Sequence, residues 1–224
     1  MSGHLDDLRR WRLPRGRHGL PRELVARSQR ERLLAAVVRV TAENGYDSTT
    51  VGDIIGEAGV GRESFYELFA DKLDCTLAAH RVLVDHLEQE VRSAYSRPGP
   101  WPQRVRSALE CTLCWFAADP AAARFTLIEL SLVGPEFRNR FREEFARFAA
   151  LLDEGLPESA DPALPHATSL AVGAALTRIY EEVLAGRAEQ LPRLFPDLTY
   201  QLLVPFLGEA AAREEQRLAV TPQP

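Results

Sequence analysis

Hydrogen-bonding side chains gather in the stretch between Thr49 and Lys72. Phe65 and Phe69 lie four residues apart there, a spacing that puts both on one face of a helix. An arginine at position 62 can donate two hydrogen bonds to guanine O6 and N7, and hydroxyl groups can donate to phosphate oxygens or base edges. These residue types predict contact with nucleic acid. Six residues fall on or near the side opposite the phenylalanines: Gly61, Arg62, Glu63, Ser64, Tyr66 and Glu67.

Patterns of catalysis and metal binding are missing from the sequence. It has no GxSxG, no phosphate-binding loop and no HExxH. Cys111 and Cys114 form a CxxC pair, but no second pair and no nearby histidine complete a zinc set. We therefore expect no enzyme, no cofactor and no metal. The cysteine pair is expected to pack in the core, with thiol sensing as the alternative.

Two short helices joined by a tight turn must position the polar side chains. The sequence predicts helices near 50–57 and 61–68, separated by Ala58-Gly59-Val60. Thr50 followed by Asp53 resembles a capping box at the start of the first helix. Gly59 supplies the positive φ that the turn requires, and Val60 fills the gap between the helices. This is the layout of a helix-turn-helix, whose second helix enters the major groove of DNA.

Longer helices are expected on both sides of this pair. One begins at Pro21 and stops at Asn44-Gly45, and another begins near Asp71 and stops before a breaker at 97–100, which we interpret as a hinge. The chain beyond this hinge is helical in pattern, without the alternation of strands. We expect a central, buried first helix there and a kink at Pro205 in the last. The expected segments are 102–118, 120–132, 135–154, 163–186 and 192–213.

Basic residues collect at the N-terminal end of an acidic chain. Residues 1–72 hold 12 Lys and Arg against 11 Asp and Glu, whereas the remainder holds 15 against 21. Phosphate contacts need local cations, so this asymmetry is typical of a chain that binds nucleic acid at one end. We expect residues 1–20 to be a flexible arm in which Arg12, Arg15 or Arg17 enters the minor groove. Non-specific attraction to DNA, or disorder, is the alternative.

About residues 30–80 closely resemble the DNA-binding domain of the TetR family of bacterial transcriptional regulators. The resemblance implies an all-α fold of about nine helices, in which an N-terminal three-helix helix-turn-helix domain precedes a C-terminal helical domain for ligand binding and dimerisation. It also implies an Ω-shaped homodimer joined by the last two long helices, and the small residues Ala171–Ala175 suit such close approach. The matching residues are Gly45, Thr50, Val51, Ile54, Ala58-Gly59-Val60, Ser64-Phe65-Tyr66, Phe69 and Lys72-Leu73.

The resemblance also implies domain boundaries and DNA contacts. The expected parts are an arm at 1–20, the helix-turn-helix domain at 21–70, a regulatory and dimerisation domain at 71–213 and a frayed tail at 214–224. Besides Arg15 and Arg17 of the arm, the residues expected at DNA are Thr49, Thr50, Gly61, Arg62, Glu63, Ser64, Tyr66 and Lys72, the last on phosphate.

Three positions depart from the family pattern. Gly61 opens the recognition helix with a weak cap, and Leu68 replaces a His or Tyr that often contacts phosphate. Glu63 stands where glycine is frequent, beside the DNA, so its carboxylate would repel phosphate unless it accepts a hydrogen bond from a cytosine amine.

The effector pocket of this family lies inside the helical core, so core residues are also pocket candidates. Each has a structural interpretation too, as a packed aromatic ring, a core histidine or a hydrogen-bonded polar group. The candidates are His80, Trp115, Phe116, Phe125, Glu129, Phe145 and Arg178.

The predicted function is that of a ligand-responsive transcriptional regulator. We expect a homodimer, more often a repressor in this family, that binds a pseudo-palindromic operator in double-stranded DNA and responds to an unknown small molecule. No stretch of the sequence suits a signal peptide or a membrane span, so we expect a cytoplasmic protein. The alternative is a dimeric helical protein that binds small molecules and has no role at DNA.

Overall fold

The described chain forms two compact units of helices. The computed structural model describes residues 21–132, 134–153, 156 and 166–220. Every regular element within these ranges is a helix, which confirms the predicted all-α class, and none of the helices described is long and apolar enough to cross a bilayer. One unit comprises residues 1–85 and 118–134, and the other comprises residues 86–117 and 135–224. The helix α5 (Lys72–Tyr95) continues from the first unit into the second.

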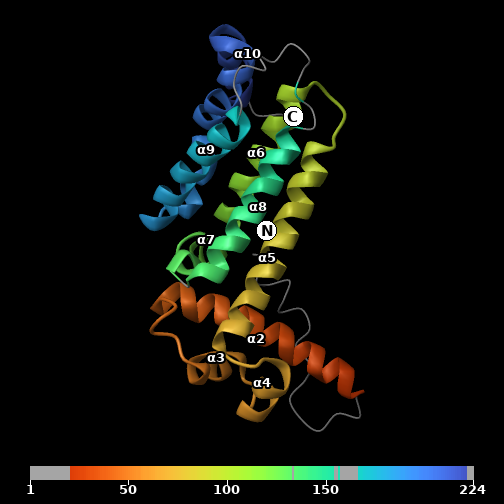
Figure 1. Cartoon of the computed structure of the whole chain (residues 1–224), viewed down its shortest axis with the longest axis vertical. Coiled ribbons are helices and arrows are strands. Elements are labelled where there is room, and N and C mark those ends of the chain that lie inside the picture. The colour runs from red at the N-terminus through yellow and green to blue at the C-terminus, as the bar shows by residue number, and fades with distance from the viewer. Residues whose placement is uncertain (1–20, 133, 154–155, 157–165, 221–224) are drawn as a thin grey trace. The chain divides into compact units, whose positions relative to one another are not determined.

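The helix α2 (Arg22–Asn44) is the centre of the first unit. Its residues from Leu33 to Val38 are all buried, so the helix is enclosed on every side at this level. It contacts α3 (Val51–Ala58), α4 (Arg62–Leu68) and α7 (Pro120–Leu127), and Figure 1 shows α2 lying across α3 and α4. A short 3-10 helix, η1 (Glu129–Leu132), follows α7.

Local signals set the ends of these helices close to where the sequence predicts them. Gly45 follows α2 with φ 81°, and its N–H donates to the Thr41 carbonyl. Thr50 caps α3 in a full capping box with Asp53, whose hydrogen bond from the Thr50 hydroxyl lowers its pKa. Gly59 then turns the chain in the left-handed conformation, with φ 61° and ψ 41°.

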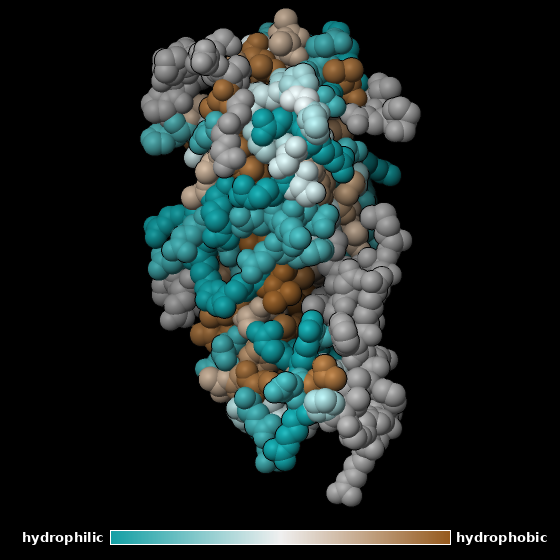
Figure 2. All heavy atoms as spheres, turned by 90° about the vertical axis from the view of Figure 1, so that its right-hand side faces the viewer, coloured by the Kyte–Doolittle hydropathy of each residue, from teal (hydrophilic) through white to brown (hydrophobic). Residues whose placement is uncertain are grey.

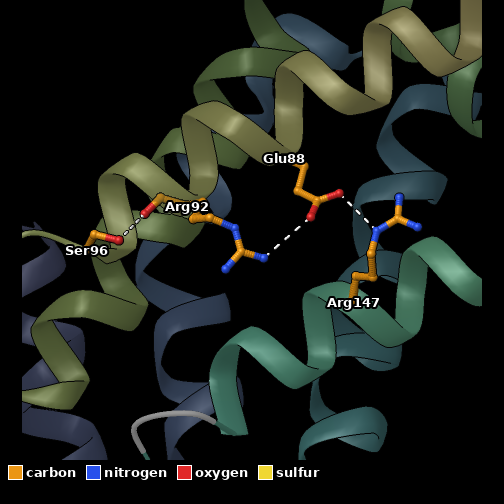
Figure 3. A network of polar contacts seen from close by, with 4 residues as sticks. All are labelled: Glu88, Arg92, Ser96 and Arg147. Atoms are coloured by element: carbon orange, nitrogen blue, oxygen red, sulfur yellow. Dashed lines mark hydrogen bonds and ion pairs between the residues drawn. The ribbon is translucent and has the colours of Figure 1, made fainter.

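The second unit contains α6 (Trp101–Ala118), α8 (Pro135–Asp153), α9 (Ala167–Leu184), the 3-10 helix η2 (Ala188–Leu194) and α10 (Phe195–Val220). The Trp101 indole N–H donates to the Leu152 carbonyl at 3.0 Å and so ties α6 to α8. Figure 3 shows a second tie, in which Glu88 of α5 accepts from Arg147 of α8 at 2.9 Å and pairs with Arg92 at 3.4 Å. The helices α9 and α10 pack side by side (Figure 1).

The small residues of α9 pack within the protomer. Ala171 and Ala175 are buried, and a Cβ at Gly173 would lie 3.7 Å from the Phe145 ring of α8. The close approach that these residues permit is therefore used between α8 and α9. Between Ala171 and Ala175, only Ala174 is fully exposed.

The last helix breaks at a residue other than the predicted one. Pro205 lies inside α10, but the non-helical backbone is at Gly208, with φ 75° and ψ 169°. After this break the chain folds back, because Gln216 donates to Asp197 at 3.1 Å although 19 residues separate them. In a straight helix these residues would be about 28 Å apart. The predicted kink at Pro205 is therefore wrong, because a glycine alone can adopt the backbone that reverses the chain.

One further expectation needs correction. The helix α6 is not buried all round, because Glu110 and Cys114 are exposed one turn apart. Cys114 departs here from the usual burial of cysteine, so its residue type did not indicate the open side. The helix α10 continues to Val220, and Glu215 within it pairs with Arg106 at 3.2 Å, so the expected fraying of the tail stays a prediction.

The face drawn in Figure 2 is largely hydrophilic where the structure describes it, and hydrophobic residues appear on it in separate groups. Such scattered apolar side chains are ordinary for a protein surface.

Candidate nucleic-acid interface

The helix α4 presents a polar face because its two phenylalanines are buried. Phe65 is fully buried and Phe69 nearly so, with their ring centroids 5.8 Å apart. Tyr66 is 51% exposed and stands edge-on to the Phe65 ring. Arg62, Glu63 and Glu67 are exposed and Ser64 is half-buried, as predicted, and Leu68 is half-buried as well.

The start of α4 is weakly capped, in agreement with the sequence. Gly61 occupies the cap position in an extended conformation and has no side chain to accept the first N–H groups. The Ser64 hydroxyl accepts a hydrogen bond from Gln29 of α2 at 3.4 Å. Packing of Phe65 and Phe69 therefore holds this short helix in place more than its cap does.

Arginines of α2 brace the helix pair. Arg39 pairs with Glu57 of α3 at 2.7 Å, and Arg32 donates to the Gly59 carbonyl in the turn at 3.4 Å. Arg30 lies over the Phe69 ring at 5.5 Å from its centroid. Part of the basic cluster noted in the sequence thus stabilises the fold of the first unit. Arg22, Arg27 and Arg30 remain exposed near the start of α2.

Thr49 and Thr50 are engaged within the protein. The Thr49 side chain is buried and donates to the Gly45 carbonyl at 2.8 Å. The Thr50 hydroxyl donates to Asp53 at 2.6 Å and accepts from the Asp53 N–H at 3.2 Å. These bonds shape the turn before α3, and contact of either residue with DNA stays a prediction.

Lys72 also turns its ammonium group inward. Its Nζ donates to the carbonyls of Tyr46 and Thr49, both at 2.8 Å, and lies 4.1 Å from the centroid of the Tyr46 ring. Burial, with Asp71 and Asp47 nearby, raises the pKa of Tyr46, so its hydroxyl stays neutral. The predicted phosphate contact of Lys72 is untested by this arrangement, which uses two of its three N–H donors.

Glu129 is a residue whose place in this interface the sequence did not reveal. It is 3% exposed, its Oε1 pairs with Arg124 at 2.9 Å, and its Oε2 accepts the Tyr46 N–H at 3.2 Å. Its apolar neighbours Ile128 and Leu130 indicated burial but could not indicate a partner 83 residues away in the sequence.

The other pocket candidates are distributed over both units. His80 and Phe125 are buried in the first unit, and Trp115 and Phe116 are buried in the second. Trp115 donates to His86 Nδ1 at 3.2 Å. Arg178 pairs with Glu181 and Glu182 on its own helix, and Glu182 also binds Arg187, which lowers the pKa of that carboxyl. A pocket formed by these residues remains a prediction. Arg12, Arg15 and Arg17 lie outside the described residues.

The cysteines are poorly suited to react as thiolates. Burial, followed by the negative charge of Glu90, raises the pKa of Cys111 to about 11. Burial raises the pKa of Cys75 to about 12, and it also raises the pKa of the exposed Cys114. Among the residues described, no three His, Cys, Asp or Glu side chains are grouped to hold a metal ion.

Comparison with known proteins agrees with this geometry. Residues 33–79 match the family of bacterial regulatory proteins named the tetR family. This match spans the second half of α2, all of α3 and α4, and the beginning of α5.

Solved structures share the fold over most of the chain. The fatty acid degradation regulator FadR from Bacillus halodurans is 24% identical, with a TM-score of 0.68 over 78% of this chain and 94% of its own. FadR from Bacillus subtilis, solved with stearoyl-CoA, is 20% identical, with a TM-score of 0.67 over 79% of this chain and 97% of its own. A TetR family regulator from Marinobacter aquaeolei VT8 is 18% identical, with a TM-score of 0.60 over 85% of this chain and 93% of its own. Residues 33–79 therefore match the helix-turn-helix segment of the tetR family of bacterial regulatory proteins, and the described chain has the fold of solved transcriptional regulators of that family.

Proposed function

We propose that the chain is a ligand-responsive transcriptional regulator, a repressor in its unliganded form, that binds a pseudo-palindromic operator as a homodimer. The observation that carries this proposal is the presentation of α4, in which Phe65 and Phe69 are buried while Arg62 and Tyr66 are exposed. A helix anchored in this way can enter the major groove and offer a guanidinium to guanine. In a dimer, two such helices about 34–36 Å apart would read two half-sites.

The exposed face of α9 supports dimerisation. Leu170 is 71% exposed and Leu184 is 52% exposed, and their spacing of 14 residues puts both on one side of α9. Exposed residues between them recur every three or four positions, the spacing of a seam between helices. The seam consists of Leu170, Ala174, Thr177, Glu181 and Leu184. We assign it to the contact with a second copy, in the region where the sequence predicts one.

The effector is proposed to be a small molecule with a long apolar part. Bacillus subtilis FadR, a structural neighbour, was solved with stearoyl-CoA. The second unit of this chain carries half-buried rings on α8 at Phe141, Phe145 and Phe148, and Phe145 is one of the residues predicted for the pocket. Binding lowers operator affinity if the ligand favours a different spacing of the recognition helices. Repression would then end when the effector binds.

Selection of bound fragments from a random DNA pool, followed by substitution of Arg62, tests the proposal. Wild-type protein is expected to select an inverted repeat and to bind it more weakly as salt rises. Arg62→Ala should weaken this binding by about 1–3 kcal/mol and relax the preference at one base position in each half-site. Arg193→Ala, an exposed arginine of η2, is the matched control and should change neither.

Failure of the wild-type protein to show salt-dependent DNA binding would overturn the proposal. That result would favour the alternative of a dimeric small-molecule-binding protein. A uniform loss of affinity for all sequences in Arg62→Ala would instead reduce Arg62 to a backbone contact. Stearoyl-CoA is the first compound to add to the operator complex, and release of the DNA is the expected result.

A further inference from the structure

The turn that joins α2 to α3 is held by two residues that are distant from it in the sequence. On one side, Lys72 Nζ donates to the Tyr46 and Thr49 carbonyls, each at 2.8 Å. On the other side, Glu129 Oε2 accepts the Tyr46 N–H at 3.2 Å. The backbone of Tyr46 is thus bound at its N–H by a carboxylate and at its carbonyl by an ammonium group.

Both charged groups are committed to this turn. Glu129 is 3% exposed, and Arg124 at 2.9 Å balances its charge. A Cβ on Gly45 would lie 3.5 Å from Glu129 Oε2, so the carboxylate closely approaches the backbone at the end of α2. The Lys72 ammonium has three N–H donors, uses two on carbonyls and lies against the Tyr46 ring. Hydrogen bonds to charged groups are stronger than those between neutral groups.

The bonds fall just before the point where α3 begins. Thr49, whose carbonyl Lys72 binds, precedes Thr50, the residue that caps α3. The direction of α3 follows from its first turn, and α4 follows α3 through the fixed Gly59 turn. A shift of the Tyr46–Thr50 turn would therefore move the helix that faces DNA.

We propose that Lys72 and Glu129 form a two-sided clamp on the Tyr46–Thr50 turn and act as positioning residues for operator binding, without themselves contacting DNA. The part of this inference that concerns DNA rests on the proposed function. The clamp assigns Lys72 a role other than phosphate binding. It also assigns Glu129 to the DNA-reading end of the chain rather than to an effector pocket.

Variants of both residues test the clamp through two separate measurements. Glu129→Leu removes the acceptor, Glu129→Gln retains a carbonyl that can accept the Tyr46 N–H, and Lys72→Met keeps the apolar stem of lysine. The first measurement is hydrogen exchange of the Tyr46 amide in the full chain without DNA. We expect at least tenfold faster exchange in Glu129→Leu and Lys72→Met, and a smaller change in Glu129→Gln. Unchanged exchange in Glu129→Leu and Lys72→Met would overturn the clamp.

The second measurement is operator affinity as a function of salt concentration. A residue that contacts one phosphate contributes about 0.9 to the slope of log affinity against log salt. Lys72→Met and Glu129→Leu should each lower operator affinity at least tenfold while leaving this slope unchanged. The double variant should lose less than the product of the two single losses, because both residues act on one turn.

The outcomes separate the clamp from the proposed function. A slope that falls by about 0.9 in Lys72→Met would make Lys72 a phosphate contact and overturn its assignment. Absence of DNA binding in the wild-type protein would end the proposed function, whereas the exchange of the Tyr46 amide would still decide whether the clamp exists. If Glu129→Leu fails to fold, Glu129→Gln decides, because it preserves the shape of the side chain. If the exchange of the Tyr46 amide and the operator affinity are then both unaltered in Glu129→Gln, the proposed role of the Glu129 charge is overturned.

Discussion

The outward face of α4 carries more negative than positive charge. Glu63 and Glu67 are exposed one turn apart, and Arg62 is the single basic residue of the helix. A carboxylate only accepts hydrogen bonds, so in the major groove it suits the amines of cytosine and adenine and is repelled by phosphate and by guanine. We infer that α4 contributes selectivity, whereas exposed arginines such as Arg22 contribute attraction to the DNA backbone.

Neutralising one of these carboxylates should therefore raise affinity while lowering selectivity. We expect Glu63→Gln to bind unrelated DNA about three- to tenfold more tightly, because a repulsion on the order of 1 kcal/mol near the phosphates is removed. Binding to operator and to random duplex, compared at one salt concentration, measures the effect. Glu189→Gln on η2 is the control for net charge. Weaker binding of Glu63→Gln to every sequence would contradict this account.

The raised pKa values of the cysteines predict slow, strongly pH-dependent alkylation. Because the pKa of Cys111 is raised to about 11, its thiol stays protonated at neutral pH. Only about 0.1% of it is thiolate at pH 8, and that fraction grows roughly tenfold for each unit of pH up to about 10. Labelling with iodoacetamide, followed by mass spectrometry of the native protein, should show this rise. A rate of labelling that stops rising below pH 8 would mean that Cys111 or Cys114 is an activated thiol. That result would support the alternative of thiol sensing.

The helices of the first unit could be predicted well because their ends depend on nearby residues. The capping box of Thr50 and Asp53, and the positive φ at Gly59, follow from residues no more than three positions apart. The burial of Phe65 and Phe69 follows from their spacing on α4. Each of these features depends on residues that are close together in the sequence, which is why a local pattern reveals it.

Features that depend on distant contacts could not be predicted in this way. The inward turn of Lys72 depends on backbone carbonyls more than 20 residues away, and Glu129 binds across 83 residues. In α10 the proline gave the stronger local signal, but the break lies at Gly208, and a contact between Gln216 and Asp197 joins the two sides of it. The candidate DNA-facing residues were therefore located by pattern, whereas the contacts that support them were not.

The break in α10 predicts a specific effect of one methyl group. Gly208 has a backbone conformation that is essentially confined to glycine, so Gly208→Ala should cost about 1–3 kcal/mol in the folded-back form. We expect α10 to straighten, with loss of the contacts that Gln216 and Arg213 make with Asp197 and Tyr200. Spin labels at Arg193 and Arg217, in protein diluted with unlabelled chain, should move apart. Pro205→Ala is the matched control and should leave the distance between the labels unchanged. A longer distance in Pro205→Ala would mean that the proline causes the break in α10.

On the scale of the whole molecule, the seam on α9 predicts the state of assembly. Leu170→Glu and Leu184→Glu should convert the dimer to monomers, because each places a charge in an apolar contact. Sedimentation or light scattering measures the mass, and operator affinity should fall at least a hundredfold because only one half-site is then bound at a time. Leu24→Glu, an exposed leucine of α2, is the control and should remain dimeric. A persistent dimer in both seam variants would place the interface elsewhere.

The first unit is assembled from two stretches of chain, residues 1–85 and 118–134, and this has a consequence for exchanging parts between relatives. The helix α7 packs against α2, and the segment after it carries Glu129. A chimera that joins only residues 1–85 to the regulatory domain of a relative would contain the relative's α7. The side chain opposite Tyr46 would then also come from the relative, in place of Glu129. Transfer of the DNA-reading end therefore needs three junctions, whereas the order of helices suggests one. Residues 118–134 must be transferred together with residues 1–85, because both stretches belong to the same unit.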